Sequence, residues 1–249
     1  KAEAVEDLAP QRGVQQPFRD PRFGAAFGPR GLAVTGAPAW FADSRALCIP
    51  GASGHLIYYS TFNRSGSVTS LVGDSPATVP GNARQIVFRR SRAVPKLEPG
   101  FDAKALDPSE IVLGNMADMS VRVLVPEGPA RWNQLAVSPD GKQLAYVSTK
   151  ESYSSIYRKS ADGTGQPDLL FRYTPGAFVP LTDWSPDAKF LTFFTGVLLV
   201  VPLGTKETGL NRKEIEWLRE DYDAFAGRFS PDGRSLAYMS NEAEVLKSQ

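Results

Sequence analysis

The sequence predicts an all-β protein built from repeated four-stranded units, a β-propeller with about five recognisable repeats. Two observations carry this prediction. Pro (20) and Gly (22) are both frequent among the 249 residues, which fits many turns and short strands better than long helices. A hairpin sequence centred on Ser-Pro-Asp also recurs from Ser138, Ser185 and Ser230, at steps of 47 and 45 residues. One propeller blade occupies about 40–50 residues, so each step matches one blade.

Each repeat predicts a tight turn between two strands. Pro sets φ at the second turn position, Ser or Asp can bond the nearby backbone, and Gly takes the position where φ is often positive. The structural turn motif comprises Ser138, Pro139, Asp140 and Gly141, then Ser185, Pro186 and Asp187, then Ser230, Pro231, Asp232 and Gly233. The second repeat has Ala188 in place of Gly. A left-handed conformation there would strain the turn by about 1 kcal/mol.

The strands after the turns are apolar on both faces, as Leu144-Ala145-Tyr146-Val147 shows. A sheet with one face in water alternates more cleanly, so these strands predict cover on both faces, which stacked blades provide. In the best-preserved repeat, strands are expected over 133–137, 144–148, 155–158 and 168–172. The apolar run 190–203 predicts two buried strands joined by a tight turn. It is shorter than the roughly 20 residues of a membrane-spanning helix, and Gly196 and Pro202 interrupt it.

The repeats divide the chain into an arm and five blades. Residues 1–34 carry no strand-like run and are predicted to be a linker or loosely ordered arm. The propeller is predicted over 35–249, with blades near 35–75, 76–130, 131–175, 176–222 and 223–249, the last one truncated. Asp43 occupies the place of Asp140 in a degenerate upstream copy, 97 residues earlier. The second blade should turn near 80–84, and residues 211–223 fit a short helix or a fourth strand with a loop equally well.

These hairpins resemble the repeats of TolB-like (WD-type) β-propellers. Within that group the chain is most similar to the propellers that lie C-terminal to bacterial eukaryote-like Ser/Thr protein kinases. The likeness is carried by residues 101–108, 157–172, 182–195 and 226–245, with a fainter match over 59–74. The resemblance implies a non-catalytic module for protein or ligand binding, acting as a sensor or interaction domain of a kinase on the extracytoplasmic or periplasmic side. The chemistry would then lie in another domain.

Two other functions stay open. The first is the gating propeller of a prolyl-oligopeptidase-type serine peptidase, whose hydrolase domain would lie downstream. The second is a free-standing periplasmic TolB-like scaffold. Kinase motifs and an apolar span upstream would favour the kinase sensor, whereas a downstream G-x-S-x-G sequence with a later His would favour the peptidase.

The residues predict no catalytic, cofactor or metal site in this chain. Kinase motifs are absent, and one histidine, His55, with one cysteine, Cys48, cannot supply a zinc site. We interpret His55 as a polar residue beside a turn and Cys48 as a small buried hydrophobe. Asp140, Asp187 and Asp232 recur at blade spacing, but each is expected to bond its own turn rather than calcium. Trp184 is expected to pack between blades.

The predicted partner is a protein or small ligand at a propeller rim or in the central channel. A formal net charge of +1 gives no large field for nucleic acid or for an anionic membrane surface. The basic residues that concentrate in one stretch are Arg84, Arg89, Arg90, Arg92 and Lys96. They form either a solvated loop or a partner-binding insertion on a rigid scaffold.

Overall fold

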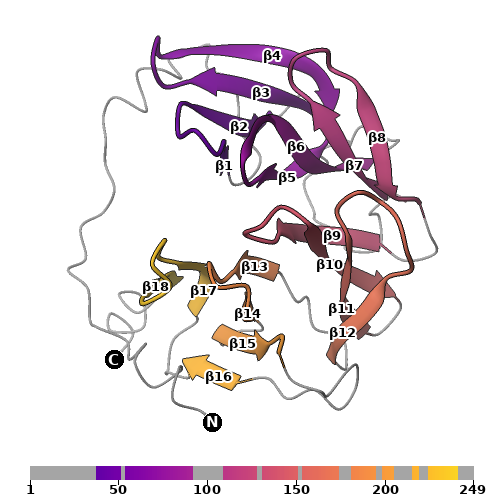
Figure 1. Ribbon diagram of the computed structural model, residues 1–249, viewed down its shortest axis with the longest axis vertical. Helices are drawn as coiled ribbons and strands as arrows, with labels where there is room; N and C mark the ends of the chain where they lie inside the picture. Colours follow the sequence, from indigo (N-terminus) through magenta and orange to yellow (C-terminus); the bar gives the residue numbers. More distant parts are fainter. Residues whose placement is uncertain are drawn as a thin grey trace, which may run out of the picture. The chain divides into compact units, whose positions relative to one another are not determined.

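A computed structural model describes residues 38–51, 54–91, 109–127, 131–150, 153–173, 181–194, 198–204, 215–218 and 224–240. In this part of the chain all regular structure is β-strand, and no helix that could cross a membrane is found there. The strands form four four-stranded sheets and one two-stranded sheet, shown in Figure 1. The all-β prediction is therefore confirmed. The chain forms two compact units, one over residues 12–132 and one from residue 133 onward.

The first unit holds two antiparallel meanders in which each strand pairs with the next one along the chain. The first sheet contains β1 (Ala39–Trp40), β2 (Ala46–Pro50), β3 (His55–Ser60) and β4 (Ser65–Val72). The second contains β5 (Asp74–Val79), β6 (Asn82–Ser91), β7 (Ser109–Asn115) and β8 (Val121–Val125). Phe41, Cys48 and Leu56 of the first sheet share one core with Phe88 and Val112 of the second. The two sheets therefore pack face to face, as neighbouring blades do.

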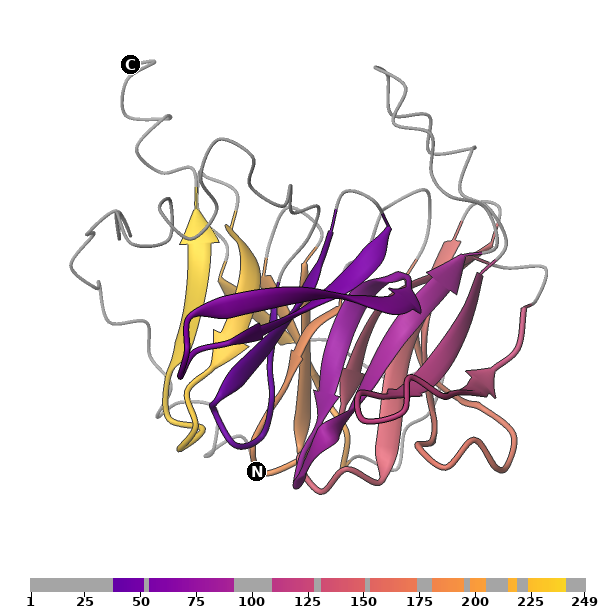
Figure 2. The same ribbon diagram turned by 90° about the horizontal axis from the view of Figure 1, so that it is seen from above.

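The second unit repeats this arrangement. Its sheets contain β9 (Arg131–Val137), β10 (Gln143–Lys150), β11 (Tyr153–Ser160) and β12 (Asp168–Tyr173), then β13 (Leu181–Trp184), β14 (Phe190–Phe194), β15 (Leu198–Pro202) and β16 (Ile215–Leu218). A two-stranded sheet of β17 (Ala224–Phe229) and β18 (Leu236–Ser240) follows, drawn in yellow in Figure 2. The sheet β9–β12 and the sheet β13–β16 share a core in which the rings of Phe171 and Phe193 lie 5.4 Å apart. Trp184 is buried in that core, as the sequence predicted.

The apolar run of residues 190–203 is covered on both faces. Phe193 and Val201 contribute to the core shared with the preceding sheet, whereas Leu198 packs against Leu236 and Tyr238 of β18. Two-sided burial explains why β14 and β15 show no polar alternation. The expectation of two buried strands over this run is confirmed by β14 and β15.

Most other strand predictions are confirmed, with longer bounds. The four strands expected in the best-preserved repeat correspond to β9–β12. In the polar stretch 211–223, the described part is the strand β16 and not a helix. The turn expected near 80–84 is centred on Pro80 and Gly81, and the strand β6 begins already at Asn82. The predicted arm over 1–34 lies outside the described residues.

Candidate functional site

The recurrent turns use their acidic residues for local hydrogen bonds. Asp140 Oδ1 accepts a bond from Ser138 Oγ at 2.6 Å and from the Lys142 amide at 3.0 Å, while Ser138 Oγ accepts the Gln143 amide at 2.8 Å. The turns of Asp187 and Asp232 repeat the same three bonds. These bonds, led by that from the Ser138 hydroxyl, hold the pKa of Asp140 below its ordinary value. Among the described residues, no group of three His, Cys, Asp or Glu side chains could hold a metal ion.

The single histidine contacts the main chain of a neighbouring strand, and the single cysteine is buried in a hydrophobic core. His55 Nδ1 lies 3.1 Å from the main-chain oxygen of Thr69 on the neighbouring strand. Cys48 is fully buried in the core of the first unit, and this burial raises the pKa of its thiol to about 12. A thiol with that pKa is protonated at neutral pH, so Cys48 is a packing residue rather than a nucleophile.

The predicted basic cluster does not form one patch in the described chain. Arg84 is exposed near the start of β6, whereas Arg89 and Arg90 lie near its end. Both are engaged in cross-strand ion pairs: Arg89 Nε and Nη2 bond Asp74 at 2.7 and 2.5 Å, and Arg90 Nε bonds Glu110 at 2.7 Å. Arg92 and Lys96 lie outside the described residues. A partner-binding role for this cluster therefore stays a prediction, with Arg84 its most accessible described member.

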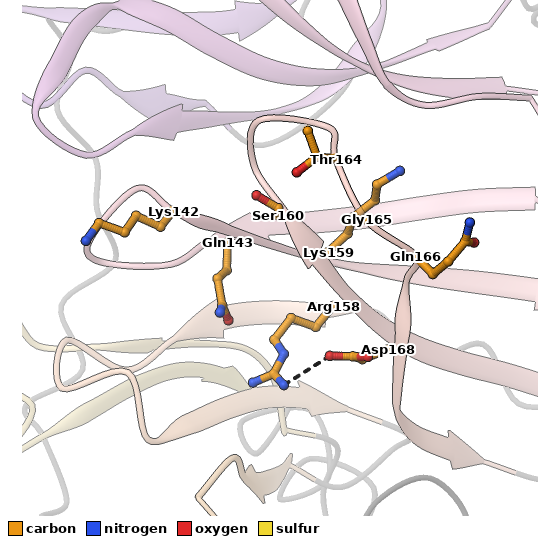
Figure 3. Close-up of a pocket in the computed structure, with 9 residues that line it drawn as sticks. All are labelled: Lys142, Gln143, Arg158, Lys159, Ser160, Thr164, Gly165, Gln166 and Asp168. Atoms are coloured by element: carbon orange, nitrogen blue, oxygen red, sulfur yellow. Dashed lines mark hydrogen bonds and ion pairs between the residues drawn. The ribbon is translucent and has the colours of Figure 1, made fainter.

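The structure instead brings three other cationic side chains to one end of the sheet β9–β12. A shallow recess of about 390 Å³ lies there, shown in Figure 3. Lys142 and Gln143 reach it from the β9–β10 hairpin, Arg158, Lys159 and Ser160 from the end of β11, and Thr164, Gly165, Gln166 and Asp168 from the β11–β12 turn and the start of β12. With three cations and one carboxylate, the lining carries a formal charge of +2.

Hydrogen bonds fix the two turns that border the recess. The Lys142 amide donates to Asp140, and the Lys142 carbonyl accepts the Ala161 amide at 2.9 Å, which ties the second turn to the first. Asp162 Oδ1 then accepts bonds from the Thr164 amide at 2.8 Å and the Thr164 hydroxyl at 2.7 Å. The recess is therefore built on a pre-organised backbone, which lowers the entropy lost when a ligand binds.

The lining suits binding better than covalent chemistry. It contains no histidine or cysteine, and the Thr164 hydroxyl already donates to a carboxylate. Arg158 Nη2 lies 3.3 Å from Asp168 Oδ2, with 31% and 69% of the two side chains exposed. An ion pair this exposed contributes at most about 1 kcal/mol, so Arg158 can exchange Asp168 for another anion at little cost.

Comparison with known proteins confirms the propeller fold. No family model and no curated protein matches the sequence. Among solved structures, a TolB-like protein from Agrobacterium tumefaciens aligns with a TM-score of 0.65 at 19% identity, over 84% of this chain and 70% of that one. An oligogalacturonate lyase solved with manganese gives a TM-score of 0.57 at 14% identity, over 82% of this chain and 61% of that one. A chain of a nidogen–laminin complex gives 0.57 at 16%, over 81% and 70%. The protein thus has the fold of TolB and other β-propellers.

The recess residues were not singled out by the sequence. Lys142 was visible only as the basic residue that closes the Ser-Pro-Asp turn, Arg158 only as the last residue of an expected strand, and Lys159 as the residue that follows that strand. The sequence feature that could have indicated the recess was the turn Ala161-Asp162-Gly163-Thr164-Gly165. In an antiparallel meander this turn lies at the same end of the sheet as the Ser-Pro-Asp hairpin.

Proposed function

We propose that this chain is a non-catalytic β-propeller module that binds a protein or a small ligand at the rim of its blades. The observation that carries the proposal is the recess at the end of the sheet β9–β12. Cationic and amide side chains from two hydrogen-bonded turns and from the end of β11 gather there, and the lining contains no histidine or cysteine. Loops on a rigid β scaffold are common places for recognition, and propellers typically serve as binding modules.

The finer proposal is that the module is a sensor or interaction domain joined to a bacterial Ser/Thr protein kinase. Its support is the likeness of residues 157–172, 182–195 and 226–245 to the C-terminal propellers of such kinases. The coding sequence on either side of this chain, together with the intact mass of the native polypeptide, tests it. A kinase domain and an apolar span upstream would support the sensor. A hydrolase downstream would exclude it.

A second candidate is a free-standing TolB-like scaffold on the periplasmic side. The structural likeness to the Agrobacterium TolB protein favours it over the remaining alternatives. A native polypeptide that contains a leader and this propeller, with neither kinase nor hydrolase, is the result expected from that candidate.

Partner capture with matched variants tests the binding function itself. Immobilised wild-type protein and the double variant Lys142→Glu/Lys159→Glu are compared for proteins retained from native extract, with Lys189→Glu as control. Lys189 occupies the place of Lys142 in the next repeat and does not line the recess. We expect a partner that is lost with the double variant and kept with the control. Equal retention by all three proteins would contradict binding at this rim.

A further inference from the structure

The cations of the recess lie on two different faces of the sheet. Arg158 and Lys159 are consecutive residues of β11, and successive side chains of a strand leave it on opposite faces. Figure 3 shows Arg158 on the side of Gln143 and Asp168, whereas Lys159 extends the other way, beside the β11–β12 turn at Thr164. One small anion therefore cannot bridge the two cationic groups.

A longer ligand that crosses the end of the sheet can reach both. Such a ligand needs at least two anionic groups separated by a spacer, one for each face. The neutral lining residues Gln143, Ser160 and Gln166 present amide and hydroxyl groups that both donate and accept. This mixture matches the alternating C=O and N–H groups of a peptide backbone and the carboxylates of acidic side chains.

Without a ligand, the carboxylate of Asp168 is the anionic group that contacts Arg158. It lies opposite Arg158 in the strand register and bonds it through a single contact of 3.3 Å. Asp168 is an exposed side chain at the start of the outer strand of its sheet, so it can swing into solvent. A ligand carboxylate would replace it on the guanidinium, where the planar fork favours two-point binding.

We propose that the recess of the sheet β9–β12 binds an acidic peptide segment, whose carboxylates contact Lys159 on one face and displace Asp168 from Arg158 on the other. This inference rests on the proposed binding function and names the chemistry of the partner. A nucleic acid is disfavoured because the described recess has no aromatic side chain for base stacking and carries Asp168 within its lining.

The test uses a fluorescein-labelled octapeptide of alternating Glu and Ser, with the peptide of alternating Gln and Ser as the uncharged reference. Binding to the full chain is measured by fluorescence anisotropy at low salt. We expect Arg158→Gln and Lys159→Gln each to weaken binding of the Glu peptide about two- to fivefold. The Lys142→Gln variant should weaken it in the same range. The matched control Lys189→Gln should leave the affinity unchanged, because Lys189 is paired with Asp187 at 3.2 Å outside the recess.

The Asp168→Asn variant distinguishes competition between Asp168 and the ligand from a purely structural role of Asp168. We expect this variant to bind the Glu peptide about two- to fivefold more tightly, because the internal competitor of the ligand is removed. In the Arg158→Gln background the gain should disappear, since the two residues then no longer share a contact. Urea midpoints of all variants, compared with the wild type, verify that the sheet is intact.

Several outcomes would overturn the inference. One is equal affinity for the Glu and Gln peptides. Another is an unchanged affinity for Asp168→Asn, or a gain that persists without Arg158. A further one is binding of a thymine oligonucleotide of equal charge with the same affinity, which would indicate a non-specific polyanion surface. If a partner captured through the rim is not competed by the Glu peptide, the acidic segment is excluded while the binding function stands.

Discussion

Ala188 adopts a left-handed backbone conformation, and the equivalent positions of the other two repeats are glycines. Its φ is 61°, and Gly141 and Gly233 have φ of 71° and 70° at the same turn position. The left-handed region costs an L-residue about 1–2 kcal/mol, and the greater freedom of glycine in the unfolded chain offsets about 0.4–1 kcal/mol of that. We therefore expect Ala188→Gly to raise the free energy of unfolding by about 0.5–1 kcal/mol, measured as a higher urea midpoint. The reciprocal change Gly141→Ala should lower it, and an unchanged midpoint in both would show that these turns carry no strain.

Asp183 links two sheets of the second unit through a half-buried carboxylate. Its Oδ2 accepts the Phe229 amide at 2.8 Å, and Arg228 Nη1 lies 3.5 Å from its Oδ1. Burial raises the pKa of Asp183 above its ordinary value of 3.8, and Arg228 and the Phe229 amide compensate only in part. The native state therefore holds this proton at a pH where the unfolded chain has lost it. As a result, the free energy of unfolding falls as pH rises from the ordinary value through the raised one.

Asp183→Asn keeps the acceptor for Phe229 and removes this titration. We expect the wild type to lose stability relative to the Asn variant as pH rises from 4 to 7, as measured by urea midpoints at both values. If the difference in urea midpoint between the two proteins is the same at both pH values, burial does not raise the pKa of this carboxyl group.

At the scale of the hairpin, even the degenerate copy near Asp43 builds the same turn. The Arg45 amide donates to Asp43 Oδ1 at 3.0 Å, as the Lys142 amide does to Asp140, and Ser44 takes the glycine position with φ of 57°. The hydroxyl of the motif is lost here because Phe41 stands in the place of Ser138. One Asp and a following basic residue were therefore enough to predict this hairpin, since the main-chain bonds of the turn depend little on the other side chains.

The junction between β4 and β5 depends on the absence of a side chain at Gly73. A Cβ there would lie 2.2 Å from the main-chain oxygen of Arg89 and 2.5 Å from the Phe88 ring. Because a backbone carbonyl cannot move aside as a side chain can, Gly73→Ala should lower the free energy of unfolding by more than about 2 kcal/mol. Gly204→Ala is the control, as a Cβ there meets no atom within 4 Å. Equal urea midpoints for the two variants would show that the strand junction can open without cost.

At the scale of the whole chain, local patterns predicted sheets well and the site poorly. Ser-Pro-Asp turns and apolar strands are short-range signals, so β9–β12 could be placed to within a few residues. The recess combines Lys142 with residues 158–168, which meet only when the meander returns to the same end of the sheet. Conversely, Arg89 and Arg90 looked available in the sequence because their carboxylate partners, Asp74 and Glu110, are 15 and 20 residues away.

The repeated turns also give the whole molecule an acid-sensitive stability. The pKa values of Asp140 and Asp232 are held below the ordinary value, first by the Ser138 and Ser230 hydroxyls and then by the backbone amides. At Asp187 partial burial acts to raise the pKa, but the bonds from Ser185 and Lys189 outweigh it. A depressed native pKa means that the unfolded chain binds protons first as the pH falls. The stabilisation is present above the ordinary Asp value of 3.8 and is lost as pH falls through the lower native values.

We therefore expect the urea midpoint of the wild type to fall steeply below about pH 4. The triple variant Asp140→Asn/Asp187→Asn/Asp232→Asn keeps an acceptor oxygen in every turn and removes the three titrations. It should be less stable than the wild type at pH 7, and the gap should narrow as pH approaches 3. Asp183 opposes this trend, because its raised pKa favours the acid side, so the profile is best read as the difference between the two proteins. If the difference in urea midpoint between the two proteins stays constant from pH 7 to pH 3, the hydrogen bonds from serine hydroxyls and backbone amides do not favour the ionised Asp side chains over the neutral ones.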